Sequence, residues 1–357
     1  MNPSKLPSPQ KLEWADNIRF FATFGVIFLH CAAPGLYFYG KVSLSHWLLL
    51  DLMDSAMRCC VPLFVMLTGA LLLRQDKALL PYLKNRFLRV VVPFIFWAFI
   101  YCLIFMKDKL LHCEIREIPK LLGEIINSII YHDGVLGQHA YHLWYIYMIM
   151  GLYLVIPILR GWIKNAQEKE IVYFLILWGI STVVLNPLLE DYNPGIELTF
   201  FGSYTGYLVL GYYLSINNFE KNRFIQKVLG IFIILLIGFT TYVTYFLSKR
   251  DGELNQDFYE YLSPNILLLS AAIFILLKKI EIKNNYFKRL SSLTNKYSFG
   301  VYLVHVLILA GLDAVGLNWK FIHPLIGIPL TTIACFSFSS SLIYLVAKIP
   351  YGQHING

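Results

Sequence analysis

The sequence predicts an all-α, polytopic integral membrane protein with about ten transmembrane helices and both termini in the cytoplasm. Of its 357 residues, 57% are hydrophobic and only 15% are charged, and the mean hydropathy is +0.58. Apolar runs of about 18 or more residues, the length that spans roughly 30 Å of hydrocarbon, recur along the whole chain. This composition excludes a water-soluble domain.

The predicted helices are apolar windows separated by polar breaks. The first, at about 18–38, is too long for the apolar core of a signal peptide and is followed by further spans, so we expect it to stay in the membrane. The other nine follow in order at about 55–73, 87–107, 141–160, 171–189, 199–216, 226–247, 263–279, 298–317 and 322–347. A shorter stretch at about 118–131 has apolar residues at helical spacing. It predicts an amphipathic helix at the membrane surface.

The distribution of charge supports this topology. With the N-terminus inside, the cytoplasmic segments carry most of the Lys and Arg residues, and the outer segments carry most of the Asp and Glu residues. The net charge of +8 therefore has a topological explanation, and we expect no nucleic-acid partner. No repeat or linker divides the chain, so we predict that residues 1–357 form one membrane domain.

The cysteines give no sign of a disulfide framework or a metal site. They fall mostly inside apolar runs, without a C-x-x-C pair and without histidines at metal-ligand spacing. They are Cys31, Cys59, Cys60, Cys102, Cys113 and Cys335. We therefore expect no metal cofactor.

The first predicted helix carries two ionisable residues on one face. Arg19 and His30 are eleven positions apart, which is three helical turns plus roughly 20° at about 100° per residue. The rise of about 16 Å sets Arg19 at the cytoplasmic mouth and His30 near the midplane of the bilayer. Ionisable residues at that depth usually line a site or a pathway, although a neutral histidine that packs against a neighbouring helix stays open.

Several stretches resemble the membrane-bound acyltransferase 3 family. They are Asp16-x-x-Arg19-x10-His30, "RCCVPLFVMLTGALLL" (58–73), "RFLR" (86–89), "YHLWYIYMIMGLYLVIPIL" (141–159) and "YSFGVYLVH" (297–305). Together they are similar to the branch that contains the O-acetyltransferase of enterobacterial common antigen. The family often has Ser-Gly where this chain has Thr68-Gly69, which keeps a hydroxyl beside a glycine.

The resemblance implies an O-acyltransferase in a bacterial inner or cytoplasmic membrane. Such an enzyme takes an acyl group, usually acetyl, from cytoplasmic acyl-CoA and delivers it to a hydroxyl of a cell-surface or lipid-linked glycan. The expected partners are acyl-CoA, a glycan or glycolipid and the lipid bilayer, and a homo-oligomer stays open.

The resemblance assigns catalytic roles to the first helix. His30 is the candidate general base, because imidazole takes up a proton near neutral pH, and a nucleophilic role through an acyl-histidine stays open. Asp16 lies one turn before Arg19 and either pairs with it or caps the helix. We expect Asp16, Arg19 and His30 to form the catalytic group.

Basic residues of the third predicted helix are candidates for binding the donor. Arg86 and Arg89 lie three apart at its cytoplasmic start and could clamp the phosphates of CoA, or they form an ordinary cytoplasmic charge cluster. His305 and Tyr302 share a helix face and either line the acyl-CoA channel or serve in helix packing.

The acceptor is expected on the outer side. Arg58 lies in the outer half of the second predicted helix, after Asp54 and Asp51, and either points into the cavity or forms a salt bridge at an exposed helix end. His142, Trp144 and Tyr145 begin the fourth predicted helix on that side. Their rings either stack on a sugar or belong to an interfacial aromatic belt.

Two further classes of function stay open. The protein is alternatively a transporter or flippase of polysaccharide or its precursors, or a structural partner of a glycan assembly machine. The absence of a visible internal repeat counts against a secondary transporter. Transfer of acetyl from acetyl-CoA distinguishes the enzyme from both.

Overall fold

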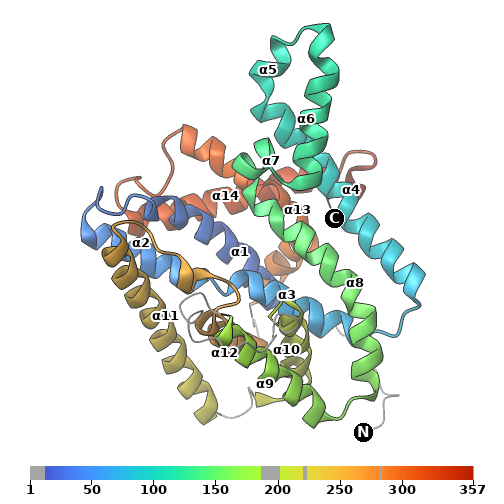
Figure 1. The fold of residues 1–357 in the computed structure, drawn as a ribbon, viewed down its shortest axis with the longest axis vertical. Coiled ribbons are helices and arrows are strands. Elements are labelled where there is room, and N and C mark those ends of the chain that lie inside the picture. The colour runs from blue at the N-terminus through green and yellow to red at the C-terminus, as the bar shows by residue number, and fades with distance from the viewer. Residues whose placement is uncertain (1–12, 186–201, 220–222, 281–283, 357) are drawn as a thin grey trace.

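The computed structural model describes residues 13–185, 202–219, 223–280 and 284–356, and these residues form helices and connecting segments without strands (Figure 1). The helices are α1 (Glu13–Leu36), α2 (Leu44–Met57), α3 (Cys60–Leu72), α4 (Leu79–Phe105), α5 (Lys107–Leu111), α6 (Ile118–Tyr131), α7 (Gly134–His139), α8 (Trp144–Asn165), α9 (Glu168–Val184), α10 (Thr205–Ile216), α11 (Arg223–Asp251), α12 (Pro264–Lys279), α13 (Asn285–Ala314) and α14 (Pro324–Val346). Short 3-10 helices are η1 (Ile115–Glu117), η2 (Tyr141–Leu143), η5 (Asp257–Tyr259) and η6 (Gly352–His354).

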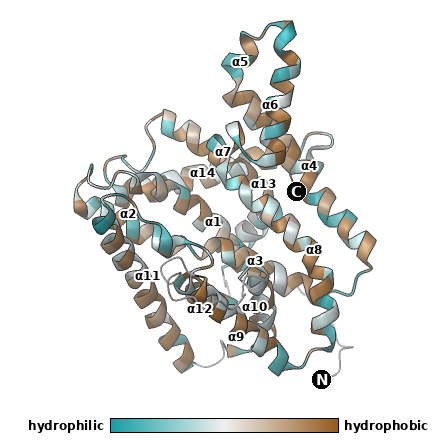
Figure 2. Ribbon diagram, in the orientation of Figure 1, coloured by the Kyte–Doolittle hydropathy of each residue, from teal (hydrophilic) through white to brown (hydrophobic). Residues whose placement is uncertain are grey.

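Eight helical segments among the described residues are long and apolar enough to cross a membrane, which confirms the predicted polytopic, all-α class. They include α11, which is predominantly hydrophobic in Figure 2 and exposes Ile231, Ile234 and Leu235 as a helix facing lipid does. The predicted spans at 171–189 and 199–216 coincide in part with the shorter helices α9 and α10, and their residues 186–189 and 199–201 lie outside the described residues. Ten spans and two cytoplasmic termini stay predictions.

The second span begins earlier than the sequence predicts. It runs from Leu44 to Leu72 through α2 and α3, whereas hydropathy predicts a start near residue 55. The reason is that α2 carries Asp51 and Asp54, which lower its hydropathy although both side chains are fully buried. The helix bends between α2 and α3, so Arg58 lies at this junction.

Helix α1 lies in the middle of the helical arrangement, where it contacts α2, α3, α12, α13 and α14. Side-chain amides fasten its first turns: Asn17 Nδ2 donates to the carbonyl of Ile280 at 2.5 Å, and Asn295 Nδ2 donates to the carbonyl of Asp16 at 2.9 Å. The face with Arg19 and His30 is therefore directed toward neighbouring helices.

Helices α3 and α10 approach each other at backbone distance. A Cβ atom added to Gly69 would lie 2.0 Å from the carbonyl oxygen of Leu208, and one added to Gly211 would lie 2.0 Å from that of Met66. Small residues permit such close contact between membrane helices. This contact holds α3 beside the site described below.

Helices α5 and α6 project from the rest of the molecule (Figure 1). Helix α6 covers the segment for which the sequence predicts an amphipathic helix, with Leu121 and Ile125 buried and Leu122 and Ile126 exposed on another face. Its place at a membrane surface stays a prediction.

Candidate active site

A cavity of about 480 Å³ opens between α1, α3, α4, α8 and α13. Four cationic side chains line it: Arg19, Arg86, Arg89 and Lys296. None of the described residues that line it is acidic. We call it the basic cavity, and it lies where α1, α4 and α13 have their N-terminal parts, on the side that the charge distribution predicts to be cytoplasmic.

The local sequence explains how these cations converge. Arg86 and Arg89 are three residues apart on α4 and therefore share a face. Arg19 pairs with Asp16 at 3.3 Å, and both side chains keep about a quarter of their surface exposed. Helix α1 begins at Glu13, so Asp16 lies inside it and does not cap it. Of the two roles that the sequence left open for Asp16, the structure shows the ion pair with Arg19.

Arg19 therefore lies with Arg86 and Arg89 of α4. The sequence grouped it with His30 as a catalytic residue, and the structure places it on the wall of the basic cavity together with Arg86 and Arg89. Arg19 and His30 lie on one helix, about three turns apart, and His30 is not among the residues that line the basic cavity.

The inner end of the basic cavity is aromatic. Tyr145 of α8 and Tyr302 of α13 line it, with ring centroids 5.4 Å apart, and Thr68 of α3 contributes a hydroxyl. The hydroxyl of Tyr302 donates a hydrogen bond to the carbonyl of His142. The cavity thus leads from cations to a polar aromatic end that touches the next cluster.

Three histidines from α1, η2 and α13 meet beside that inner end. The ring centroids of His305 lie 5.2 Å from His30 and 4.7 Å from His142, and those of His30 and His142 lie 6.5 Å apart. His305 is fully buried, His142 is 2% exposed and His30 is half-buried. The ring of Tyr302 lies 5.7 Å from His305, so this histidine cluster adjoins the basic cavity.

Backbone carbonyls orient two of these rings. His305 Nδ1 lies 2.6 Å from the carbonyl of Tyr302, and His142 Nε2 lies 3.4 Å from that of Leu303. Since a carbonyl only accepts, those two nitrogens carry the hydrogens. His305 Nε2 and His142 Nδ1 are left as buried lone pairs without a partner.

His30 has a different neighbour. Its Nδ1 lies 3.3 Å from the hydroxyl of Tyr141, and the two rings meet edge to face at 5.2 Å. His30 therefore lies between His305 of the histidine cluster and Tyr141 of η2.

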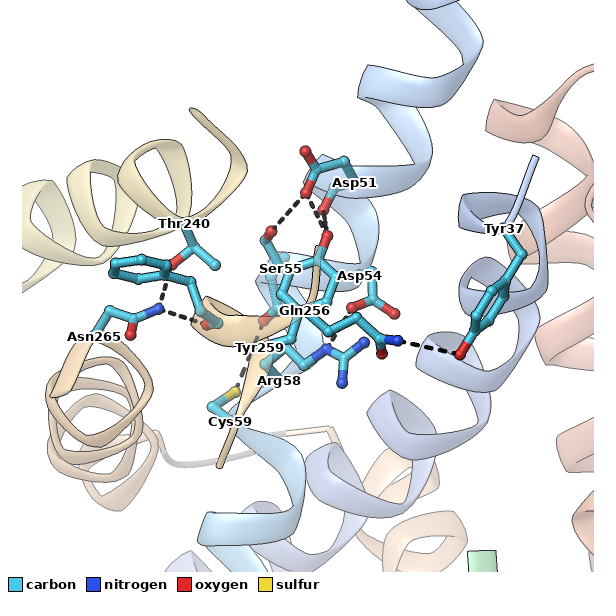
Figure 3. A network of polar contacts seen from close by, with 12 residues as sticks. Tyr37, Asp51, Asp54, Ser55, Arg58, Cys59, Thr240, Gln256, Tyr259 and Asn265 are labelled. Atoms are coloured by element: carbon cyan, nitrogen blue, oxygen red, sulfur yellow. Dashed lines mark hydrogen bonds and ion pairs between the residues drawn. The ribbon is translucent and has the colours of Figure 1, made fainter. Parts of the chain in front are cut away.

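A buried ionic network surrounds Arg58 (Figure 3). Its Nε donates to Asp54, and its guanidinium lies 4.1 Å from the centre of the Tyr259 ring. The hydroxyl of Tyr259 donates to Asp51, which also accepts from Ser55 at 3.2 Å. Because the Arg58 side chain is only 12% exposed, the sequence alternative of an exposed helix end is wrong.

Trp144 and Tyr145 point to different places, as neighbours separated by about 100° on a helix do. Trp144 stacks on Tyr261 with ring centroids 5.8 Å apart, and Tyr261 lies within electrostatic range of Arg58. Tyr145 instead lines the basic cavity. The sequence assigned both residues to the acceptor, and the structure places Tyr145 on the wall of the basic cavity.

Sequence reasoning missed Lys296, Tyr141 and Tyr259. A signal existed for Lys296, because it directly precedes the stretch "YSFGVYLVH" (297–305) on the same helix, α13. Ser298 and Tyr302 of that stretch also line the cavity. No local pattern in the sequence predicts that Tyr259 contacts Arg58, because only the tertiary fold brings η5 to the end of α2.

Within the described ranges, no group of three or more His, Cys, Asp or Glu side chains is placed to hold a metal ion. The six cysteines are unpaired, and five of them are buried.

Comparison with known proteins gives one match. Residues 12–344 match the acyltransferase 3 family, which is described as an acyltransferase domain. Neither a curated protein nor a solved structure matched the chain. The matched segment contains every residue of the basic cavity and of the histidine cluster. The chain therefore belongs to the acyltransferase 3 family.

Proposed function

We propose that the protein is an integral-membrane O-acyltransferase that moves an acetyl group from cytoplasmic acetyl-CoA to a hydroxyl of a cell-surface or lipid-linked glycan. Membership of the family supports acyl transfer. The observation that carries the finer proposal is the basic cavity, because its cations lead inward to Tyr302 and hence to the histidine cluster.

We propose acyl-CoA as the donor because its negatively charged phosphates complement the cations of the basic cavity. CoA carries a diphosphate and a further phosphate, and guanidinium groups bind phosphate oxygens through paired hydrogen bonds. Arg86, Arg89, Arg19 and Lys296 supply four positive charges at one end. The aromatic end then receives the narrow pantetheine arm and the thioester.

A small acyl group suits the inner end. His305 is fully buried and His142 is nearly so, and the rings of the histidine cluster pack against Tyr302. We therefore favour acetyl, the smaller group, over succinyl.

His30 is the proposed general base. It takes the proton from the acceptor hydroxyl while the hydroxyl oxygen attacks the thioester carbonyl carbon, so that a C–O bond forms and the C–S bond breaks. The bond between His30 and Tyr141 orients the imidazole. Removing the hydroxyl proton at the moment of attack is the contribution that a neutral imidazole makes best near pH 7.

The acceptor approaches from the side of Arg58. This guanidinium, held by Asp54, and the stacked rings of Trp144 and Tyr261 offer a hydrogen-bond donor and flat apolar faces, the pair of features that sugars require. The five stretches similar to the enterobacterial common antigen branch support a glycan acceptor and a bacterial cytoplasmic membrane.

The test is calorimetric binding of acetyl-CoA in detergent, followed by measurement of acetyl transfer. We expect micromolar binding by the wild type, its loss in Arg86→Ala/Arg89→Ala, and its retention in His30→Ala with transfer abolished. Lys84→Ala is the matched control, because Lys84 is an exposed cation of α4 that does not line the cavity.

Two outcomes would overturn the proposal. Folded wild type that does not bind acetyl-CoA would favour a transporter or flippase. Equal weakening by Lys84→Ala and by the arginine pair would mean that these cations act only as a diffuse cytoplasmic charge.

A further inference from the structure

The proposed reaction moves a proton as well as an acetyl group. The acceptor hydroxyl loses its proton near His30, and the CoA sulfur must gain one when the C–S bond breaks. Both events take place at the thioester carbonyl carbon, where the oxygen bond forms and the sulfur bond breaks. His30 holds the removed proton on the side of Tyr141, whereas the thioester enters past Tyr302, so the proton needs a route from His30 to the sulfur.

His305 has the geometry of an intermediate on that route. Its ring lies 5.2 Å from His30 and 5.7 Å from Tyr302, between the base and the cavity wall. Its Nδ1 hydrogen is held by the carbonyl of Tyr302 at 2.6 Å, which leaves Nε2 as a proton acceptor. That Nε2 is buried and has no partner.

The polar groups around His305 fix its backbone and leave Nε2 free. Cys335 donates to the His305 carbonyl at 3.4 Å, and the hydroxyl of Tyr101 donates to the carbonyl of Leu303 at 3.2 Å while accepting from the amide of Leu307 at 3.0 Å. None of these bonds reaches the imidazole. A buried nitrogen without a hydrogen-bond partner costs free energy. His305 Nε2 can recover this free energy when it binds a proton during the reaction.

We infer that His305 relays the acceptor's proton from His30 to the leaving CoA sulfur. This inference rests on the proposed function. His30 takes the hydroxyl proton, and a rotation of either ring brings nitrogens of the two imidazoles within hydrogen-bonding distance. His305 accepts the proton at Nε2 and gives it to the sulfur, so that free CoA leaves as the thiol and both histidines return to the neutral form.

His142 is the matched comparison. It is also buried, bonded to a backbone carbonyl of α13 and left with one unpartnered nitrogen, Nδ1, but its ring lies farther from His30, at 6.5 Å against 5.2 Å for His305. Its carbonyl is the acceptor for Tyr302. We therefore assign it to the packing of the cluster, outside the proton route.

The test compares two thioesters in His305→Gln and His142→Gln. One is acetyl-CoA, and the other is an acetyl thioester of 5-thio-2-nitrobenzoate, whose acidic thiol leaves without being protonated. With acetyl-CoA, we expect His305→Gln to lower kcat at least 100-fold while KM changes less than about threefold, since general acid–base groups contribute 10²–10⁴-fold. With the acidic thioester, the loss should shrink to less than tenfold.

The comparison separates a relay from a structural role. His142→Gln should lower both rates by the same factor, because it does not handle the leaving group. If His305→Gln also lowers both rates equally, the relay is wrong. If the wild type transfers nothing from acetyl-CoA, the proposed function itself has failed.

A measurement on the wild type covers the case in which His305→Gln does not fold. We expect the rate of acetyl-CoA turnover to depend non-linearly on the deuterium fraction of the solvent, because two or more protons move together. With the acidic thioester, the dependence should become linear. Linear dependence with both donors would contradict the relay.

Discussion

At the residue scale, the ion pair of Asp54 and Arg58 is held away from water. The Asp54 side chain is fully buried, and Arg58 is 12% exposed. Breaking such a pair leaves an uncompensated buried charge, which costs about 3–5 kcal/mol, whereas replacing both partners by apolar groups costs much less. The ring of Tyr259 covers the other face of the guanidinium and adds to its fixed position.

We therefore predict that Asp54→Ala lowers the free energy of unfolding by about 3 kcal/mol or more, since Arg58 then has no counter-charge. The double variant Asp54→Ala/Arg58→Met should recover a large part of this loss, as measured by denaturation in detergent. Glu124→Gln is the control, because its pair with Lys109 is exposed and its loss should leave the midpoint unchanged. A double variant less stable than Asp54→Ala would contradict this account.

At the element scale, the contact of α3 with α10 positions one wall of the basic cavity. Leu67, Thr68 and Leu71 of α3 line that cavity, and Gly69 lies between them on the face toward α10. A side chain at Gly69 would push α3 away from Leu208 and into the cavity. Helix packing and donor binding are therefore coupled through one glycine.

We predict that Gly69→Ala and Gly211→Ala each lower the thermal midpoint and weaken acetyl-CoA binding, because the added Cβ would meet backbone atoms that cannot move aside. Gly151→Ala on α8 is the matched control, since no heavy atom lies within 4 Å of its added Cβ. In a helix interior, that change should stabilise by up to about 1 kcal/mol. Retained binding in both α3 and α10 variants would show that this contact does not shape the cavity.

At the scale of the whole molecule, the proposed reaction takes its donor from one side of the membrane and its acceptor from the other. The basic cavity opens where α1, α4 and α13 have their N-terminal parts, and the segment from α5 to α7 connects the opposite ends of α4 and α8. If the cavity faces the cytoplasm, then α5 and α6 lie outside. The orientation is set by the bias of Lys and Arg toward one side.

Cysteine labelling tests this orientation without any engineered residue. Cys113 lies in the α5–α6 connection and is partly exposed, whereas the other five cysteines are buried. We predict that a membrane-impermeant maleimide labels the wild type on intact cells and that Cys113→Ser abolishes the labelling. Labelling that requires permeabilised cells would reverse the topology and place the basic cavity outside.

Much of the candidate site follows from local spacing. Arg86 and Arg89 share a helix face because they are three residues apart, and both line the basic cavity. Tyr302 and His305, also three residues apart, share a face of α13, and Tyr302 reaches the same cavity. Such predictions need only the helical period of 3.6 residues.

Other parts of the site depend on contacts between segments far apart in the chain. The approach of His305 to His30, the bond of Tyr141 to His30 and the ring of Tyr259 over Arg58 join residues from five different helical segments. Hydropathy also placed the start of the second span too late, because it scores Asp51 and Asp54 by type and not by the partners that bury them.

The sequence by itself determined the membrane class, the helical segments and the residues that carry charge or imidazole, because these depend on composition and on the period of one helix. The tertiary structure alone decided which of them meet. It brought Arg19 to the arginines of α4, Tyr145 to the basic cavity and His305 to His30. The physical reason is that these contacts depend on how helices pack, through close approaches such as that of Gly69 to Leu208, and no local pattern encodes the partner.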